Sequence, residues 1–276
     1  MDIYECEIVP GAAPVPVEIV ETDIDLYYHI ALALYLEIEK NNAAGKNSVF
    51  ILPVGPVYQY RRFVWLCRLR PLDLSRVYCF FMDEYLDDSG KRIPRDHPLS
   101  FRGFIQRELL DLMPAEMNLK NEQVLFPDPE DPAAYDRKLQ ELGQADICFA
   151  GVGINGHLAF NEPPEPGEEI GAEAFKALPT RVLKLSRETI TINSYTALRG
   201  AFERVPTRAV TIGYRQIFSS KRVRVYLNRP WQRSVVRKLL FGDITPRFPA
   251  SLLRDHPDTR LVMTREVAAK PEFQLK

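Results

Sequence analysis

The segment from Gly151 to Pro163, GVGINGHLAFNEP, places a histidine and a glutamate on one glycine-rich turn. An unperturbed histidine titrates at about 6.5, so His157 can exchange protons near neutral pH. A carboxylate such as Glu162 close to the imidazole can fix its tautomer and raise its pKa. The two residues are therefore a candidate acid/base pair, although ion pairs of this kind are also common as purely structural features.

A second candidate base, Asp83, follows the apolar run Arg76–Met82, which has the composition of a buried strand. A carboxylate at the end of a strand in an α/β sheet is suited to act as a general base. Aspartate is also a common N-cap residue, so the sequence leaves open whether Asp83 instead caps a following helix.

The residues GVGING, at 151–156, match the G-x-G-x-x-G pattern of dinucleotide-binding proteins. That pattern requires a helix that begins at the third glycine, so that the pyrophosphate lies at the helix N-terminus. Prolines at 163, 164 and 166 follow here and exclude a long helix. We therefore expect the turn to bring backbone N–H groups close to a small ligand, without a dinucleotide cofactor.

The pattern of apolar residues predicts the elements that position these side chains. Short apolar runs predict strands at 49–54, 76–82, 145–150, 210–212, 223–227 and 260–263. Helical spacing predicts helices at 23–41, 58–69, 98–110, 133–142, 232–241 and around 250–254. This alternation indicates a mostly parallel, twisted, Rossmann-like α/β sheet with helices on both faces. Because no linker or repeat divides the chain, we expect one domain over residues 1–276.

Ligands of such sheets bind beyond the carboxyl ends of the strands. Three predicted strands end at Gly55, at Asp83-Glu84 and at Gly151. We therefore expect these residues to lie together on one edge of the sheet.

The composition argues against several classes of function. The formal net charge is −1, which gives no basic footprint for nucleic acid or an anionic membrane. No apolar run reaches the roughly 18 residues that a membrane span needs, and the acidic N-terminus does not resemble a secretory signal. The four cysteines are scattered without a C-x-x-C pair, so we expect no disulfide framework, no zinc site and a cytoplasmic location.

Several segments together resemble the glucosamine-6-phosphate deaminase (isomerase) family. They are FMDEY at 81–85, HPLSF at 97–101, GVGINGHLAFNEP at 151–163, LSRETITINS at 185–194 and RAVTIGYRQIFSSKRVRVYL at 208–227. The similarity runs through nearly the whole chain. The sister family of 6-phosphogluconolactonases shares the glycine turn but lacks the FNEP and MDEY signatures, so it ranks second.

The resemblance implies conversion of an amino-sugar phosphate into a keto-sugar phosphate and ammonia, without a metal or redox cofactor. It implies that Asp83 moves a proton from C2 to C1, that His157 assists opening of the sugar ring, and that Glu162 orients His157. Asn155, at a position that is aspartate or asparagine in the family, would hydrogen-bond to the histidine system. We also expect contacts to the substrate from Gly55, Glu84, Gly153 and Gly156.

The sequence departs from the family where a phosphate would be held. The stretch 52–56 reads LPVGP in place of LPTGSTP, so the Ser/Thr pair is missing. Tyr195 stands where the resemblance implies an arginine, and Gln232 where it implies a lysine. Hydrogen bonds to charged groups contribute roughly 1.5–3 kcal/mol each, so the loss of three anchors predicts an altered substrate. We expect Tyr195 and Gln232 to lie where this altered substrate binds.

The sequence leaves open whether other residues replace the missing phosphate anchors. Four arginines could replace them or could be ordinary surface charges: Arg61, Arg62, Arg229 and Arg233. Three tyrosines could instead line a pocket for a neutral or larger sugar: Tyr58, Tyr60 and Tyr195.

The sequence leaves three functions to consider: an isomerase/deaminase with an altered substrate, a catalytically silent sugar-binding or regulatory protein, and a lactone hydrolase. In each the partner is a small sugar or sugar phosphate, with neither nucleic acid nor membrane involved. The family ranges from monomers to hexamers, which leaves a homo-oligomer open.

Overall fold

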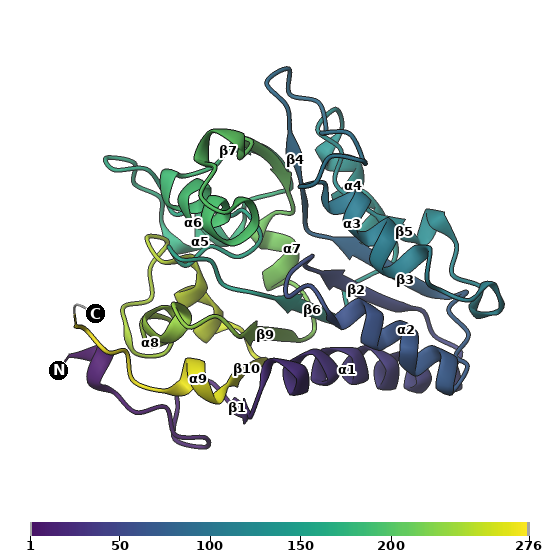
Figure 1. The fold of residues 1–276 in the computed structure, drawn as a ribbon, viewed down its shortest axis with the longest axis horizontal. Coiled ribbons are helices and arrows are strands. Elements are labelled where there is room, and N and C mark those ends of the chain that lie inside the picture. Colours follow the sequence, from purple (N-terminus) through teal and green to yellow (C-terminus); the bar gives the residue numbers. More distant parts are fainter. Residues whose placement is uncertain (1, 275–276) are drawn as a thin grey trace.

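The computed structural model describes residues 2–274, and its centre is a seven-stranded sheet in which every pair of neighbours is parallel (Figure 1). The strand order is β1-β10-β9-β6-β2-β3-β5. The strands are β1 (Val17–Val20), β2 (Ser48–Leu52), β3 (Val77–Phe81), β5 (Val124–Leu125), β6 (Ile147–Ala150), β9 (Val223–Leu227) and β10 (Thr259–Thr264). This confirms the mostly parallel, Rossmann-like α/β fold.

Helices cover both faces of this central sheet, because its strands are apolar on both sides. In β2, Phe50 and Leu52 pack in one core, and Val49 and Ile51 pack in the other. The first core is closed by α1 (Asp23–Ala43), α2 (Gln59–Leu69) and α3 (Phe101–Ile105), which continues as a π-helical turn over Gln106–Leu110. The second core is closed by α4 (Pro132–Glu141), α7 (Tyr214–Phe218), α8 (Gln232–Phe241) and the 3-10 helix Pro249–Asp255.

The remaining helices are short or lie near the surface. They are α5 (Ala172–Lys176), α6 (Arg187–Leu198), α9 (Arg265–Ala268) and four 3-10 turns at Ile3–Glu5, Ala115–Met117, Asn121–Gln123 and Phe202–Arg204. Two expected helices differ in detail. The helix expected at 98–110 begins at Phe101, because the Ser100 side chain accepts the Gly103 N–H and caps it. The helix expected around 250–254 is of the 3-10 type.

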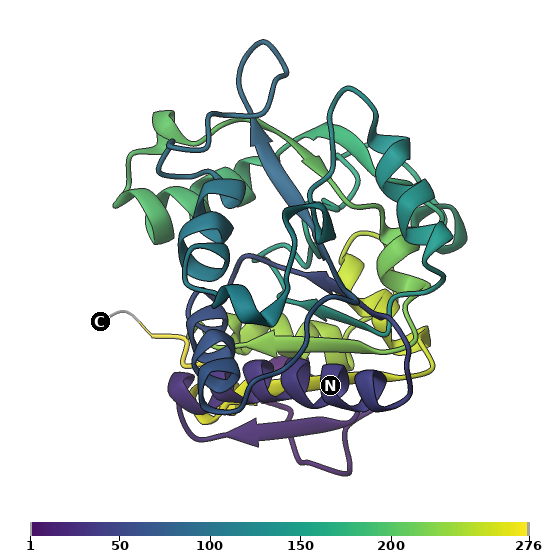
Figure 2. The ribbon, with the colours of Figure 1, turned by 90° about the vertical axis from the view of Figure 1, so that its right-hand side faces the viewer.

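A small antiparallel sheet lies on the side of the molecule opposite α1 (Figures 1 and 2). Its order is β4-β8-β7, with β4 (Asp83–Leu86), β7 (Arg181–Lys184) and β8 (Arg208–Thr211). The apolar pattern predicts β8 but neither β4 nor β7, and it does not predict the antiparallel pairing. Only Met82 separates β3 from β4, so the small sheet begins directly at the carboxyl edge of the central sheet.

Candidate functional site

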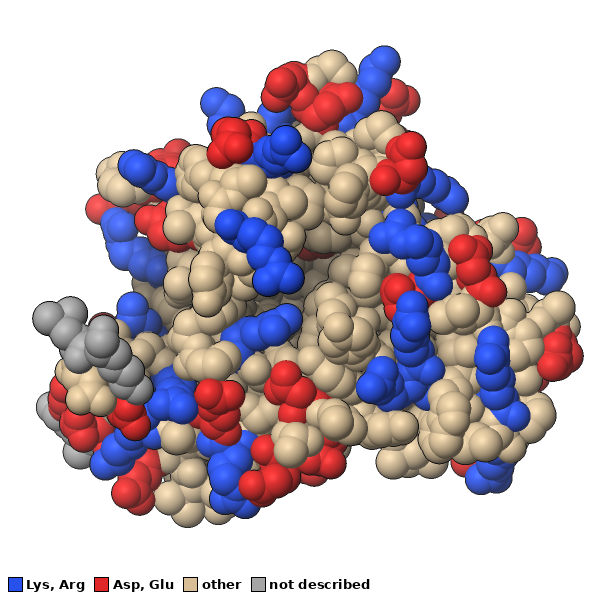
Figure 3. All heavy atoms as spheres, viewed as in Figure 1, with Lys and Arg blue, Asp and Glu red and all other residues tan. Residues whose placement is uncertain are grey.

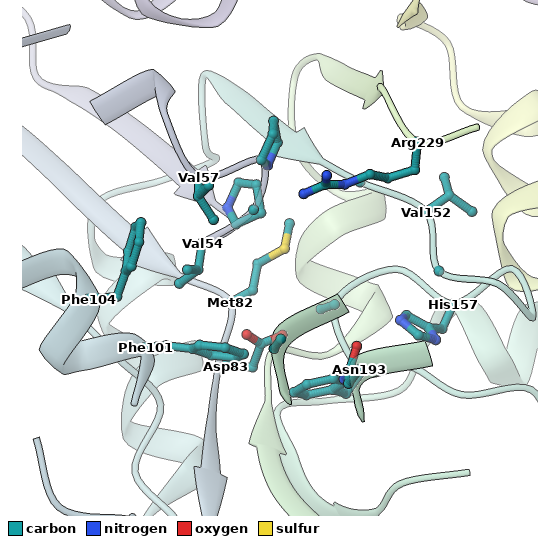
Figure 4. A pocket seen from close by; sticks show the side chains of 18 of the residues that line it. Val54, Val57, Met82, Asp83, Phe101, Phe104, Val152, His157, Asn193 and Arg229 are labelled. Carbon is teal, nitrogen blue, oxygen red and sulfur yellow. The ribbon is translucent and has the colours of Figure 1, made fainter. Parts of the chain in front are cut away.

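A cavity of about 400 Å³ lies between the carboxyl ends of the central strands and the small sheet. In Figure 3 a hollow opens near the centre of the molecular face, and Figure 4 shows the side chains that line the cavity. Gly55, Asp83 and Gly151 all belong to its lining, which confirms that these three strand ends share one edge. The lining also includes Met82, Phe101, Gly153, His157, Asn193, Asn228, Arg229 and Gln232.

His157 faces this cavity with a fixed tautomer. Its Nδ1 lies 2.8 Å from Oδ1 of Asn155 and 3.1 Å from Oγ1 of Thr189. An amide oxygen only accepts, so Nδ1 carries the proton and donates it to Asn155. The other ring nitrogen, Nε2, has no hydrogen-bond partner among the described residues. Nε2 is therefore the atom that can exchange a proton with a ligand.

Glu162 determines this arrangement through Asn155. Its Oε2 accepts a hydrogen bond of 2.7 Å from Nδ2 of Asn155 and lies 3.4 Å from Nδ1 of His157. Because a carboxylate only accepts, it orients the Asn155 amide so that the amide oxygen faces the imidazole. Burial alone would raise the pKa of Glu162, but its interactions with His157, Asn155 and Thr189 lower it to about 2. Glu162 is therefore a fixed negative charge at neutral pH.

The environment of Asp83 raises its pKa, whereas that of Glu162 lowers it. Asp83 is the first residue of β4 and only 7% exposed, and its carboxylate has no hydrogen bond or ion pair among the described residues. Burial, together with the negative charge of Glu84, raises the pKa of Asp83 well above its usual range. The helix-cap alternative is wrong, because Asp83 lies in a strand and Ser100 caps the next helix. The carboxyl is therefore a stronger base than an ordinary aspartate.

Glu84 lies outside the cavity, which corrects the expectation that it contacts a ligand there. It is 0% exposed. Its carboxylate accepts hydrogen bonds from Oγ of Ser100, from the N–H groups of Phe101 and Arg102, and from the Arg102 guanidinium. Glu84 therefore fixes the N-terminal end of α3 against β4.

Two glycines of the turn have different roles. A Cβ on Gly153 would lie 2.1–2.6 Å from ring atoms of His157, so only glycine lets the imidazole pack against this backbone. Gly156 has φ +88°, and a Cβ there would meet the Phe248 ring at 2.6 Å. Gly156 is not part of the cavity lining, so it shapes the turn and the expectation of a ligand contact does not hold for it.

Tyr195 and Gln232 differ from their expected role as substrate contacts. Tyr195 is 72% exposed on α6 and lies outside the cavity. Gln232 lines the cavity, but its amide is occupied: Oε1 accepts the N–H groups of Asn228 and Arg229 at 2.9 Å, and Nε2 donates to the Val152 carbonyl. Gln232 therefore fixes the loop between β9 and α8.

Three of the four arginines considered as replacement anchors have other partners. Arg61 pairs with Glu108. The Arg62 guanidinium lies 5.7–5.9 Å from the ring centroids of three tyrosines. Arg233 donates to the Glu266 carbonyl. Arg229 alone among the four lines the cavity.

The sequence interpretation did not identify Thr189 and Asn193 as site residues. Both lie on α6, one helical turn apart, where Thr189 contacts His157 and Nδ2 of Asn193 donates to the Tyr85 hydroxyl at 2.8 Å. Their i, i+4 spacing in LSRETITINS was a usable signal, because such residues share one face of a helix.

Residues 2–274 contain neither a metal-binding cluster nor a helix able to cross a membrane. No group of three His, Cys, Asp or Glu side chains is arranged to hold a metal ion. No helix in this part of the chain has the length and apolar character that crossing a membrane requires.

Known proteins with similar sequences are glucosamine-6-phosphate deaminases, although no protein-family profile matches the chain. The enzyme of Clostridium acetobutylicum is 30% identical over 231 residues, which is 81% of this chain and 88% of the relative. That of Thermoanaerobacter pseudethanolicus is 28% identical over 250 residues, 87% of this chain and 91% of the relative.

Solved structures with a similar fold include a member of the same family and a member of its sister family. A monomeric glucosamine-6-phosphate deaminase has a TM-score of 0.78 at 27% identity and covers 92% of this chain and 99% of its own. A 6-phosphogluconolactonase from Thermotoga maritima has a TM-score of 0.63 at 16% identity, covering 90% of this chain and 99% of its own. At that identity, the second likeness shows the fold alone.

Proposed function

Because the chain belongs to the glucosamine-6-phosphate deaminase family, we propose that it is an amino-sugar isomerase/deaminase that forms a keto sugar and releases ammonia. One observation carries the proposal: Asp83 and His157 line the same cavity, each without a competing partner at the atom that its role requires. The carboxyl has a raised pKa and no partner, and the imidazole has a fixed tautomer with Nε2 free. Pairs of titratable groups in contrasting environments are typical of acid/base catalysis.

The geometry supports the following roles for the three side chains in the reaction. Nε2 of His157 moves a proton from the C1 hydroxyl to the ring oxygen, which opens the sugar to its aldehyde. Asp83 then takes the proton from C2 and delivers it to C1, while the C2 ammonium gives up one proton and O1 takes one up. The C2 amine becomes an iminium, which water hydrolyses to the ketone and ammonia. Glu162 stays ionised and holds Asn155, so that the imidazole keeps the tautomer needed for the first step.

We further propose that the substrate differs from that of the relatives. The loop after β2 presents Val54, Gly55 and Val57 to the cavity and carries none of the hydroxyl groups that the family resemblance implies. Phe101, Phe104 and Leu99 add to this apolar wall. A substrate with an apolar substituent near this wall would gain from its burial.

Release of ammonia from a panel of amino sugars and their 6-phosphates tests the proposal. We expect release from at least one of them, and loss of that release in an Asp83→Asn variant. Folded protein that releases no ammonia from any of them would contradict the proposal. Binding without turnover would then support the catalytically silent alternative, and hydrolysis of 6-phosphogluconolactone would support the lactonase alternative.

Replacement of Gly153 by alanine is expected to lower kcat by about 100-fold, because the new methyl group displaces the His157 ring and small misplacements of a catalytic group have effects of this size. Steady-state kinetics measures the effect. Gly171→Ala is the matched control, since a Cβ there meets nothing within 4 Å and the residue lies outside the cavity. Equal loss of activity in both variants would show that the ring contact is not the cause.

A further inference from the structure

We propose that the protein binds a small multivalent anion, carrying phosphate or carboxylate groups, in a second cavity between α1 and the central sheet. This α1 cavity has a volume of about 290 Å³. α1 lies beside β9 and β10 on this side of the sheet (Figure 1). Four cationic side chains line the cavity: Lys40, Arg222, Arg224 and Arg260. Binding there does not depend on the proposed reaction.

The strands that form the floor of the α1 cavity carry arginines where the rest of this face is apolar. On the same face, β2 presents Phe50 and Leu52 to the core beneath α1 and α2. In contrast, β9 presents Arg224 and β10 presents Arg260 to the cavity. Strands of a parallel sheet that helices cover are normally apolar on both faces. Packing alone therefore does not account for these two arginines.

Arg224 and Arg260 are direct neighbours across the parallel pair β9 and β10. Adjacent strands lie about 5 Å apart, so the two positive charges start from neighbouring positions and repel each other. The Arg224 guanidinium is held by Asp258, to which its Nη1 donates at 2.9 Å. Arg260 is exposed and has no hydrogen bond or ion pair to any residue between 2 and 274. A bound anion between them would replace this repulsion with attraction.

The acidic groups around the α1 cavity do not balance its cations. Glu37 is the only aspartate or glutamate among the described lining residues. Its carboxylate is shared between Arg222 at 2.6 Å and Lys40 at 3.7 Å. Glu18 lies outside the lining and faces His29, 3.4 Å from its Nε2. The interior of the cavity therefore keeps an excess of positive charge.

The spacing of the cations indicates the class of ligand. Arg222 and Arg224 are two residues apart along the chain, and a strand rises about 3.3 Å per residue, so the cations spread over roughly 7 Å. One phosphate or carboxylate cannot contact both ends of such a row, whereas an anion with two or more groups can. A guanidinium binds either group through two parallel hydrogen bonds. The small volume of the cavity suits a compact ligand such as a diphosphate or a tricarboxylate.

Calorimetry at low ionic strength with pyrophosphate, citrate and inorganic phosphate tests the inference. We expect the wild type to bind pyrophosphate or citrate more tightly than inorganic phosphate, and the preferred probe identifies the anionic group. Arg260→Ala should weaken binding of that probe about 10-fold or more, as for loss of a charged hydrogen bond. Arg260→Lys should keep part of the affinity. Equal binding of inorganic phosphate would contradict a multivalent ligand.

Two control variants separate the α1 cavity from other cationic positions. Arg204→Ala should bind as the wild type does, because Arg204 is exposed and lines neither cavity. Tyr226 lines both cavities, so binding beside Asp83 must also be distinguished, and Arg229→Ala does this. Affinity that is lost in Arg229→Ala but kept in Arg260→Ala would overturn the inference. Absence of binding of every probe to the wild type would do the same.

Thermal unfolding gives a second readout that does not use affinity. Without an anion at low salt, Arg260→Ala should melt no lower than the wild type, because it removes the repulsion with Arg224. Pyrophosphate or citrate should raise the Tm of the wild type, since a ligand that binds only the folded state stabilises it. The Tm of Arg260→Ala should change much less. A variant that melts well below the wild type without any anion would contradict the repulsion on which the inference rests.

Discussion

Replacement of Asp83 by asparagine is expected to lower kcat by about 10²- to 10⁴-fold, the range that a positioned general base contributes. The amide has nearly the same shape but cannot take the C2 proton. In the wild type, kcat/KM should fall as the pH is lowered through the raised pKa of Asp83, because only the ionised carboxyl is a base. Glu162, with a pKa of about 2, stays ionised and does not contribute to this fall. Steady-state rates between pH 4 and 9 measure both effects.

The same variant should be more stable than the wild type at high pH. The pKa of Asp83 is raised in the folded protein, so its ionisation there opposes folding. Below the unfolded pKa, about 3.9, the carboxyl is neutral in both states and the penalty is absent. As the pH rises through the folded pKa, the wild type loses this stability and the asparagine variant does not. The Tm difference should therefore be larger at pH 8 than at pH 4.

Glu84→Gln provides a matched comparison one residue away. The Glu84 carboxylate is fully buried and holds Ser100, the Phe101 N–H and Arg102, so its neutralisation should lower Tm. Loss of its charge should also move the acid limb of the rate profile to lower pH, since Glu84 helps to raise the pKa of Asp83. If Glu84→Gln were stable but inactive, and Asp83→Asn were destabilised but active, the roles would be reversed. Glu84 would then be the base, and Asp83 the residue that stabilises the fold.

The contrast between these neighbours shows what the sequence could and could not predict. Apolar runs such as β6 and β9 predict strands buried on both faces, and the central sheet follows from them. The pattern ends before Asp83, because DEYL is half polar, so β4 is not predicted. Successive residues of a strand point to opposite sides. Asp83 and Glu84 therefore have opposite surroundings, which is unpredictable until the strand is known.

Local sequence also predicts only part of the site. His157, Asn155 and Glu162 come from one turn, and their proximity follows from their spacing. Thr189 comes from α6, a helix whose place beside the turn depends on the small sheet that the apolar pattern does not predict. Tyr195 lies on the same helix but on its exposed side, so alignment with an expected ligand position did not place it in the cavity.

Replacement of His157 by glutamine is expected to lower kcat by about 100-fold or more, because glutamine cannot carry a proton from the C1 hydroxyl to the ring oxygen. Binding of an open-chain amino-alditol phosphate should change little, since such a compound needs no ring opening. Steady-state kinetics and calorimetry measure the two quantities. A merely structural histidine would instead weaken binding and lower Tm together.

The control for this prediction is His29→Gln, since His29 itself lies outside the cavity and contacts only its edge, where Nδ1 lies 3.0 Å from the Tyr226 hydroxyl. It should leave kcat unchanged. If His157→Gln lost affinity for the open-chain compound as strongly as it lost kcat, the imidazole would be a binding group and not the group that opens the ring. Asp83→Asn should lose turnover whether the substrate is cyclic or already open. The two variants therefore assign ring opening and proton transfer between C2 and C1 to separate side chains of one cavity.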